Sequence, residues 1–125
     1  MLKNHFGNKM TEHSIQTKVV QYIRTFYPDV LICSIPNGSG TTASNRIHLY
    51  QEGLLAGMPD LFIAEARHGF NGMFIEMKTT KGTESKEQEK IRKQLNDKGY
   101  LVFVAQSDRT AINLIEDYLL RDDKI

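Results

Sequence analysis

Two short acidic motifs, Pro59-Asp60 and Glu76-Met77-Lys78, contain residue types that could do chemistry. Two carboxylates placed side by side repel each other, so one takes up a proton unless a cation lies between them. Oxygen ligands of this kind suit Mg²⁺ or Mn²⁺, and the main-chain carbonyl of Met77 could be a further ligand. Lys78 could orient or deprotonate a water, or stabilise charge on a phosphate. The chemistry that these residues suggest is metal-assisted hydrolysis of a phosphodiester.

Each motif borders a short apolar run, which is what a position at the end of a strand requires. Asp60 opens the run 61–64, Glu76 and Lys78 follow the run 73–75, and turn-forming residues lie between the runs. This pattern predicts a hairpin, in which Asp60 at the start of one strand can meet Glu76 on the other. Glu76 and Lys78 would project from one face of their strand, about 6.5 Å apart. Either motif alone is most often a solvated strand end, but the pair at this spacing is more specific.

Composition limits the class of protein. The chain has 125 residues, which fits one domain over residues 11–125 after an N-terminal arm at 1–10. Its net charge of +1 means that nucleic acid would have to bind at a local basic patch. The single cysteine, Cys33, excludes an internal disulfide and fits a reducing compartment, and we interpret it as a core residue. No apolar run could span a membrane and no signal peptide is visible, so we expect a soluble intracellular protein.

The first predicted helix begins after the cap Thr11 and ends near residue 26, with a core-facing stripe at Ile15, Val19, Tyr22, Ile23 and Phe26. On a helical wheel Glu12 falls inside this stripe, and Gln16 flanks it one turn later. A carboxylate that faces a core needs a partner, and a metal shared with Asp60 and Glu76 would be one. The alternative is an exposed first-turn acid favoured by the helix dipole.

The middle of the chain offers two candidate contacts for phosphate. A strand is predicted at 30–35, followed by the loop 36–42, which contains Asn37 and could present main-chain N–H groups to a phosphate. A short helix at 43–52 carries Arg46, which could bind a phosphate bidentately. A plain surface loop and a solvent-facing arginine are the alternatives.

A third predicted helix spans residues 85–98 and begins with a capping box, Ser85 to Gln88. Gln88 shares a face with Ile91 and Leu95, so it could point at the sheet and bond a phosphate, a base or Lys78. It could also be a capping residue alone. The densest positive cluster of the chain, a candidate surface for a nucleic-acid backbone, comprises Lys81, Lys86, Lys90, Arg92 and Lys93.

The C-terminal part reads as a strand followed by a helix. Residues 100–105 are apolar on both faces, as a central buried strand would be. A last helix, capped by Ser107 or Asp108, runs to about Leu120 with a broad apolar face, part of which could form a subunit interface. The predicted order α-β-α-β-β-α-β-α indicates an α/β sandwich with a mixed central sheet flanked by helices.

Pro59-Asp60 followed by Glu76-Met77-Lys78 resembles the PD-(D/E)xK nuclease motif, which implies a restriction-endonuclease-like fold. Together with Asn37-Gly38, Gly57-Met58, the Ser85 to Gln88 box and Gly99-Tyr100, the pattern over residues 11–106 resembles the VRR-NUC domain, the virus-type replication-repair nuclease. The resemblance implies a stand-alone, phage-like member, a DNA endonuclease that uses Mg²⁺ or Mn²⁺ in the cytoplasm of a bacterial or phage-infected cell. Its one mild departure is Met77, at a position where another apolar residue is common.

Residue by residue, the resemblance implies that Asp60, Glu76 and the Met77 carbonyl bind metal and that Lys78 and Gln88 are catalytic. The acid of the first helix corresponds best to Glu12, with Gln16 as the adjacent candidate. Asn37, Arg46, Lys81, Lys86 and Arg92 are the predicted contacts to nucleic acid.

Stand-alone members are expected to be homodimers that resemble Holliday-junction resolvases, with paired sites suited to symmetric cutting of a four-way junction. A flap- or nick-directed nuclease would use the same residues, and a non-catalytic DNA-binding module is a third hypothesis.

Overall fold

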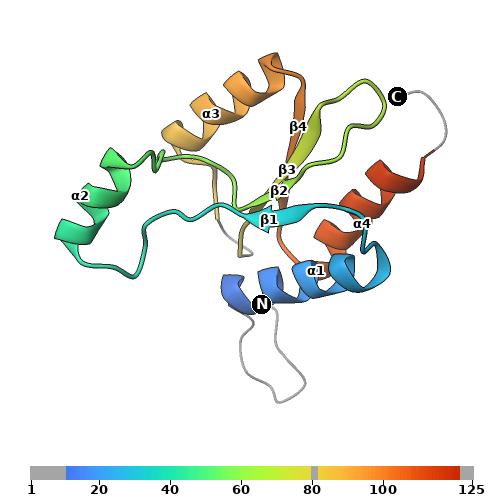
Figure 1. Ribbon diagram of the computed structural model, residues 1–125, viewed down its shortest axis with the longest axis horizontal. Coiled ribbons are helices and arrows are strands. Elements are labelled where there is room, and N and C mark those ends of the chain that lie inside the picture. The colour runs from blue at the N-terminus through green and yellow to red at the C-terminus, as the bar shows by residue number, and fades with distance from the viewer. Residues whose placement is uncertain (1–10, 80–81, 122–125) are drawn as a thin grey trace.

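The structure, a computed structural model, describes residues 11–79 and 82–121. Within these ranges it contains helices and strands in the predicted order, and it confirms the mixed α/β fold class (Figure 1). The elements are α1 (Glu12–Phe26), β1 (Ile32–Ser34), α2 (Ala43–Gln51), β2 (Leu61–Ile63), β3 (Gly72–Met77), α3 (Lys86–Asp97), β4 (Tyr100–Ala105) and α4 (Asp108–Leu120). The N-terminal arm predicted at residues 1–10 lies outside the described residues.

The sheet has the strand order β1-β2-β3-β4. β1 pairs with β2 and β2 with β3 in antiparallel fashion, whereas β3 and β4 are parallel and are joined by the crossover through α3. The predicted hairpin is therefore confirmed, with Leu61 opposite Ile75 and Ile63 opposite Met73. A mixed sheet results because the connection at residues 64–71 returns the chain antiparallel, while the helical crossover returns it parallel.

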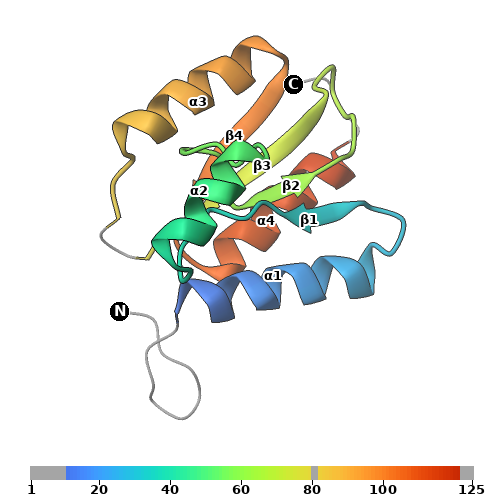
Figure 2. The same ribbon diagram turned by 60° about the vertical axis from the view of Figure 1, so that its left-hand side comes forward.

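Helices cover both faces of the sheet (Figure 2). α1 and α4 pack together on one face and form the main core with the inward side chains of the strands. These inward side chains alternate along β2 and β3, as a strand requires: Leu61, Ile63, Met73, Ile75 and Met77. α3 lies over the other face, where the rings of Phe62 and Phe74 stack and the ring of Tyr100 meets both of them edge-on. β3 is buried along its whole length.

α2 stands apart from these layers (Figure 1). Thr42 caps it by accepting a hydrogen bond from the N–H of Asn45, yet none of its residues is buried. Its capping and its loops, rather than packing on the sheet, therefore define its position.

Two predictions about burial are wrong. Cys33 is exposed, because it lies on the edge strand β1 and points away from the core that its neighbour Ile32 enters. Residues 100–105 form an edge strand instead of a central one, and Phe103 and Val104 are 36% and 44% exposed. The run is apolar on both faces because α3 and α4 both contact β4.

The core stripe of α1 is narrower than predicted. Ile15, Val19 and Ile23 are buried, but Tyr22 is half-buried and Phe26 is 63% exposed. Tyr22 and Tyr27 both donate to Oε2 of Glu116 on α4, at 3.1 and 2.6 Å, which joins the two helices at a polar rim. In the described ranges no helix combines the length and the apolar character needed to cross a membrane.

Candidate active site

The site begins with the contact between Asp60 and Glu76. One residue beyond the Leu61–Ile75 pair, the antiparallel register places Asp60 opposite Glu76. Their side chains are hydrogen-bonded to each other, and Oδ2 of Asp60 also accepts a 2.8 Å bond from the backbone N–H of Met77. Glu76 is only 9% exposed, and among the described residues it is the one with a charged side chain that is buried. The sequence-based expectation that these two carboxyl groups meet is confirmed.

The environment of Glu76 strongly disfavours its charge. The pKa of its carboxyl is raised from 4.5 to about 8, first because it is buried, then because it is hydrogen-bonded to Asp60 and close to that residue's charge. The charge of Lys78 opposes this shift, and the charge of Glu12 adds to it. At neutral pH the Asp60–Glu76 pair therefore keeps a proton between its carboxyl groups, at the position where a cation could bind.

Lys78 is held beside this pair by α3. Its Nζ donates a 3.0 Å hydrogen bond to Oε1 of Gln88, and the same oxygen accepts a 2.9 Å bond from the N–H of Ser85. The Ser85 hydroxyl accepts from the N–H of Gln88 in return, which completes the predicted capping box. Gln88 therefore forms the capping box and bonds Lys78 with the same amide oxygen, so it is not a capping residue alone.

A glycine turn brings Asp60 and α3 together. Gly57 has a φ of +93°, and a Cβ at this position would lie 2.5 Å from the carbonyl oxygen of Glu87 in the first turn of α3. Only glycine combines this conformation with so close an approach. The turn before Pro59 therefore sets the distance between the carboxyl pair and the Lys78–Gln88 bond.

Glu12 lies near the carboxyl pair without joining it. It is exposed in the first turn of α1, as the alternative interpretation held, and it lines a groove that also contains Gln16 and Asp60. Over residues 11–79 and 82–121, no cluster of three or more His, Cys, Asp or Glu side chains is close enough to hold a metal. A place for Glu12 or Gln16 in a metal site remains a prediction.

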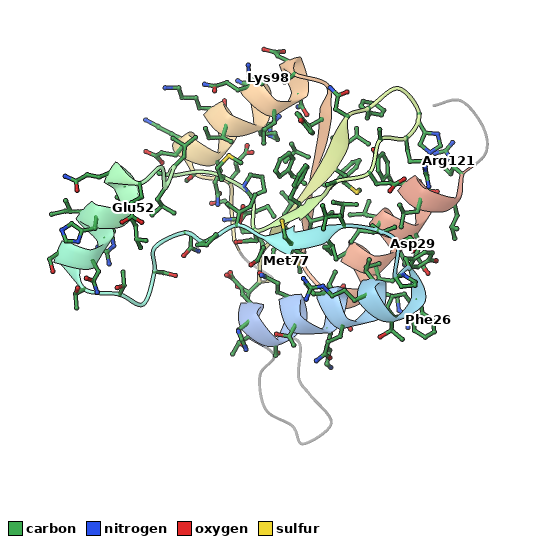
Figure 3. All side chains as sticks on the ribbon, viewed as in Figure 1. Phe26, Asp29, Glu52, Met77, Lys98 and Arg121 are labelled. Carbon is green, nitrogen blue, oxygen red and sulfur yellow. The ribbon has the colours of Figure 1, made fainter. Side chains whose placement is uncertain are left out.

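The donor chemistry at Asp60 and Glu76 nevertheless fits a hard divalent cation. Two carboxyl groups that share a proton when no cation is present offer oxygen ligands at one point. Mg²⁺ commonly takes one or two protein carboxylates and completes its shell with water and substrate phosphate. Met77 is buried between the sheet and α1 (Figure 3), and its N–H serves Asp60; the role of its carbonyl as a ligand also stays a prediction.

Two predicted nucleic-acid contacts are engaged within their own loop. Asn37 lines the same groove as Asp60, and its Oδ1 accepts bonds from the N–H and hydroxyl of Ser39 at 2.9 and 2.6 Å. Arg46 donates to the carbonyls of Gly38 and Thr41, both at 3.4 Å, and α2 carries it away from the carboxyl pair. The loop is thus held by Asn37 from within and by Arg46 from α2, and Asn37 is the one of the two that lies in the groove beside Asp60.

On the α3 side, Arg92 lies near Lys78 but is already paired. It donates two hydrogen bonds to Glu84, at 2.7 and 3.1 Å, and both residues line a small pocket with Lys78 and Glu76. Lys86 is exposed on the first turn of α3, and Lys81 lies outside the described residues. Sequence reasoning missed Glu84 as the partner of Arg92. The available signal was an acidic residue just before the start of α3, eight positions before an arginine within that helix.

Comparison with known proteins gives a consistent result. The model of the VRR-NUC domain family matches residues 10–109. A solved structure described as a VRR_NUC domain protein superposes with a TM-score of 0.77 at 26% sequence identity, over 99% of this chain and 96% of that chain. A search of curated proteins finds no match.

Proposed function

The chain belongs to the VRR-NUC domain family, nucleases of the PD-(D/E)xK type, and from this premise we propose that it is a divalent-metal-dependent DNA endonuclease selective for branched DNA. A four-way junction is the first candidate substrate, and a homodimer is the proposed acting form. The observation that carries the proposal is the contact between the Asp60 and Glu76 carboxyl groups beside the Lys78–Gln88 hydrogen bond.

Asp60 and Glu76 would hold the metal, with the Met77 carbonyl and Glu12 as further candidate ligands. A bound Mg²⁺ or Mn²⁺ would supply Lewis-acid polarisation of a phosphate oxygen and activation of water. The buried position of Glu76 keeps one side of such a site free of bulk solvent, which strengthens the electrostatic interactions within it. The N–H of Met77 fixes the orientation of the Asp60 carboxylate before any ligand arrives.

Lys78 would act directly on the substrate. Lys78 is half-buried, and the oxygen of Gln88 holds its ammonium at the strand end next to the carboxyl pair. A cation fixed there stabilises the negative charge that develops on a phosphate, with no reorganisation needed at the moment of reaction. Gln88 is then a positioning residue that acts through the lysine.

Two features support the proposal that DNA is recognised by its shape. The net charge of +1 provides little general attraction for DNA, so binding must depend on local contacts. The exposed Lys86 and Lys90 on α3 offer such contacts to the backbone, where they would position DNA without reading its sequence. These observations fit branch-directed cutting at a junction, and they fit cutting at a flap or nick equally.

Exposed apolar side chains support the homodimer. Ile47, Tyr50 and Leu55 are exposed on and next to α2, and Phe103 and Val104 are exposed on the edge strand β4. Surfaces of this kind are candidates for cover by a second copy. Sedimentation tests this part of the proposal, since a strict monomer at micromolar concentration would contradict paired cutting.

The activity is tested with labelled four-way junction, 5′ flap and linear duplex DNA, each incubated with Mn²⁺ or with EDTA. We expect symmetric, metal-dependent cuts in the junction by the wild-type protein and none by Glu76→Ala. Glu87→Ala, which removes an exposed glutamate of α3, is the matched control and should cut normally. Cleavage of the flap alone would show that the flap, and not the junction, is the substrate. Binding without any cleavage would favour a non-catalytic module.

A further inference from the structure

A groove of about 730 Å³ opens beside the carboxyl pair, between α1 and the end of β1. Asp60 and Glu12 lie at one end, and Arg24 lies twelve residues further along α1, which is about 18 Å of helix. The groove is separate from the small pocket on the α3 side that contains Lys78 and Arg92. A strand of DNA cut at Asp60 and Glu76 would therefore have two ways out, and this is the wider one.

The α1 wall of the groove is a continuous stripe. Successive positions at helical spacing, among them Gln16, Val20, Gln21 and Arg24, face it, next to the core stripe of Ile15, Val19 and Ile23. Two of these residues are glutamines whose side-chain amides make no hydrogen bond to any other described residue. Polar groups without partners along a groove are available to a ligand.

The opposite wall combines apolar and polar groups. Ile35 and Pro36 provide an apolar surface. The side-chain oxygen of Asn37 accepts from Ser39, and its amide nitrogen makes no hydrogen bond to any other described residue. At the far end Arg24 uses one nitrogen to hold the carbonyl of Ile32, at 3.1 Å, which leaves other guanidinium donors for a phosphate. The walls thus offer apolar contact, amide donors and acceptors, and one cation.

This combination matches unpaired nucleotides. A base has an apolar face and a polar edge, and side-chain amides are suited to hydrogen bonding with base edges. The volume is in the range of sites for small molecules, about 300 to 1,000 Å³, whereas duplex DNA binds across broad surfaces. A groove of this volume is too small for a double helix and large enough for one or two unstacked nucleotides.

We propose that the groove between α1 and the end of β1 receives unpaired nucleotides of the DNA next to the scissile phosphate. The inference rests on the proposed function for its ligand, DNA, and it deepens that function by naming the substrate class. Substrates of this class carry single-stranded nucleotides at the cut, as a flap does or as a four-way junction does when its branch point is opened. Gln21 and Arg24 are specificity-determining contacts at the end away from the carboxyl pair.

The test replaces Gln21, an exposed residue of the groove, with glutamate. Gln21→Glu places a negative charge where phosphates would pass, and Gln21→Ala removes the amide alone. The matched control is Asn113→Glu, which adds the same charge at an exposed position in the middle of α4, outside the groove. Binding of a fluorescein-labelled 12-nucleotide single strand and of a 12-base-pair duplex is measured by anisotropy in the presence of Ca²⁺.

We expect Gln21→Glu to weaken single-strand binding at least fivefold and Gln21→Ala two- to threefold, with duplex binding changed less than twofold. Asn113→Glu should change neither by more than twofold. Equal single-strand affinities for Gln21→Glu and Asn113→Glu would overturn the proposal, and so would equal losses for single strand and duplex.

Cleavage of a flap and of a fully paired nicked duplex in Mn²⁺ separates this inference from the proposed function. If the wild type cleaves DNA and Gln21→Glu binds single strands as well as the wild type does, the proposed role of the groove is refuted and the proposed nuclease activity stands. If Gln21→Glu loses single-strand binding and the wild type cleaves no DNA, the proposed nuclease activity is refuted and the proposed role of the groove stands.

Discussion

Replacing Glu76 with glutamine should make the metal-free protein more stable at alkaline pH. Glutamine keeps the size and hydrogen-bonding capacity of the protonated glutamate but cannot ionise. The folded-state pKa of Glu76 is raised to about 8 from 4.5, so the folded chain binds a proton that the unfolded chain releases between these values. The stability contributed by this proton is complete below pH 4.5 and is lost as the pH rises through 8.

The magnitude follows from the size of the pKa shift. Each pKa unit corresponds to about 1.4 kcal/mol, which sets a ceiling of about 5 kcal/mol for the whole shift. Partial access of solvent to the carboxyl pair screens this value, and we take about 2 kcal/mol as the loss between pH 5 and pH 8. Wild type and Glu76→Gln should therefore be similarly stable at pH 5, and the variant should be about 2 kcal/mol more stable at pH 8.

The assay is urea unfolding of both proteins at several pH values, in EDTA, with Glu87→Gln on the exposed face of α3 as control. All other titrating groups are shared, so the difference between the two pH profiles reports the titration of Glu76 together with its hydrogen-bonded partner Asp60. Parallel profiles, or equal destabilisation of the variant at pH 5 and pH 8, would refute the burial and pairing of this carboxyl group. Mn²⁺ at pH 8 should stabilise the wild type and have a much smaller effect on the variant.

The remaining predictions concern the groups around the pair. Lys78→Ala should lose turnover and keep its affinity for metal, as measured by calorimetry; unchanged turnover would show that the lysine has no part in the reaction. Gly57→Ala should destabilise the protein by about 2 to 4 kcal/mol in thermal or urea unfolding, because it combines a strained φ with a backbone clash against α3, and a neutral effect would contradict that packing. Glu84→Gln should free Arg92, strengthen DNA binding at low salt and steepen the log–log salt dependence by about one unit, whereas Glu89→Gln, which also removes an acid from an ion pair on α3, should leave the slope unchanged.

Local sequence patterns were sufficient to predict the order of the helices and strands and the contact between the two carboxyl groups of the site. Periodicity and caps predicted the helices, and Ser85 and Gln88 form the expected capping box because its hydrogen bonds join residues three apart. The meeting of Asp60 and Glu76 was also predictable. A short turn between two strands leaves few registers that keep both apolar runs facing the core, and those registers place the two acids together.

The tertiary structure decided what depends on distant partners. Whether the apolar run 100–105 is central or at an edge depends on the strand order, and the exposure of Cys33 depends on which face of β1 a helix covers; neither is encoded near those residues. The pairing of Arg92 with Glu84 and the groove along α1 arise where separate elements come together. The sequence by itself therefore determined which groups could do chemistry and which strands carry them, because those are local properties, while long-range packing decided which groups are held, paired or left open to a ligand.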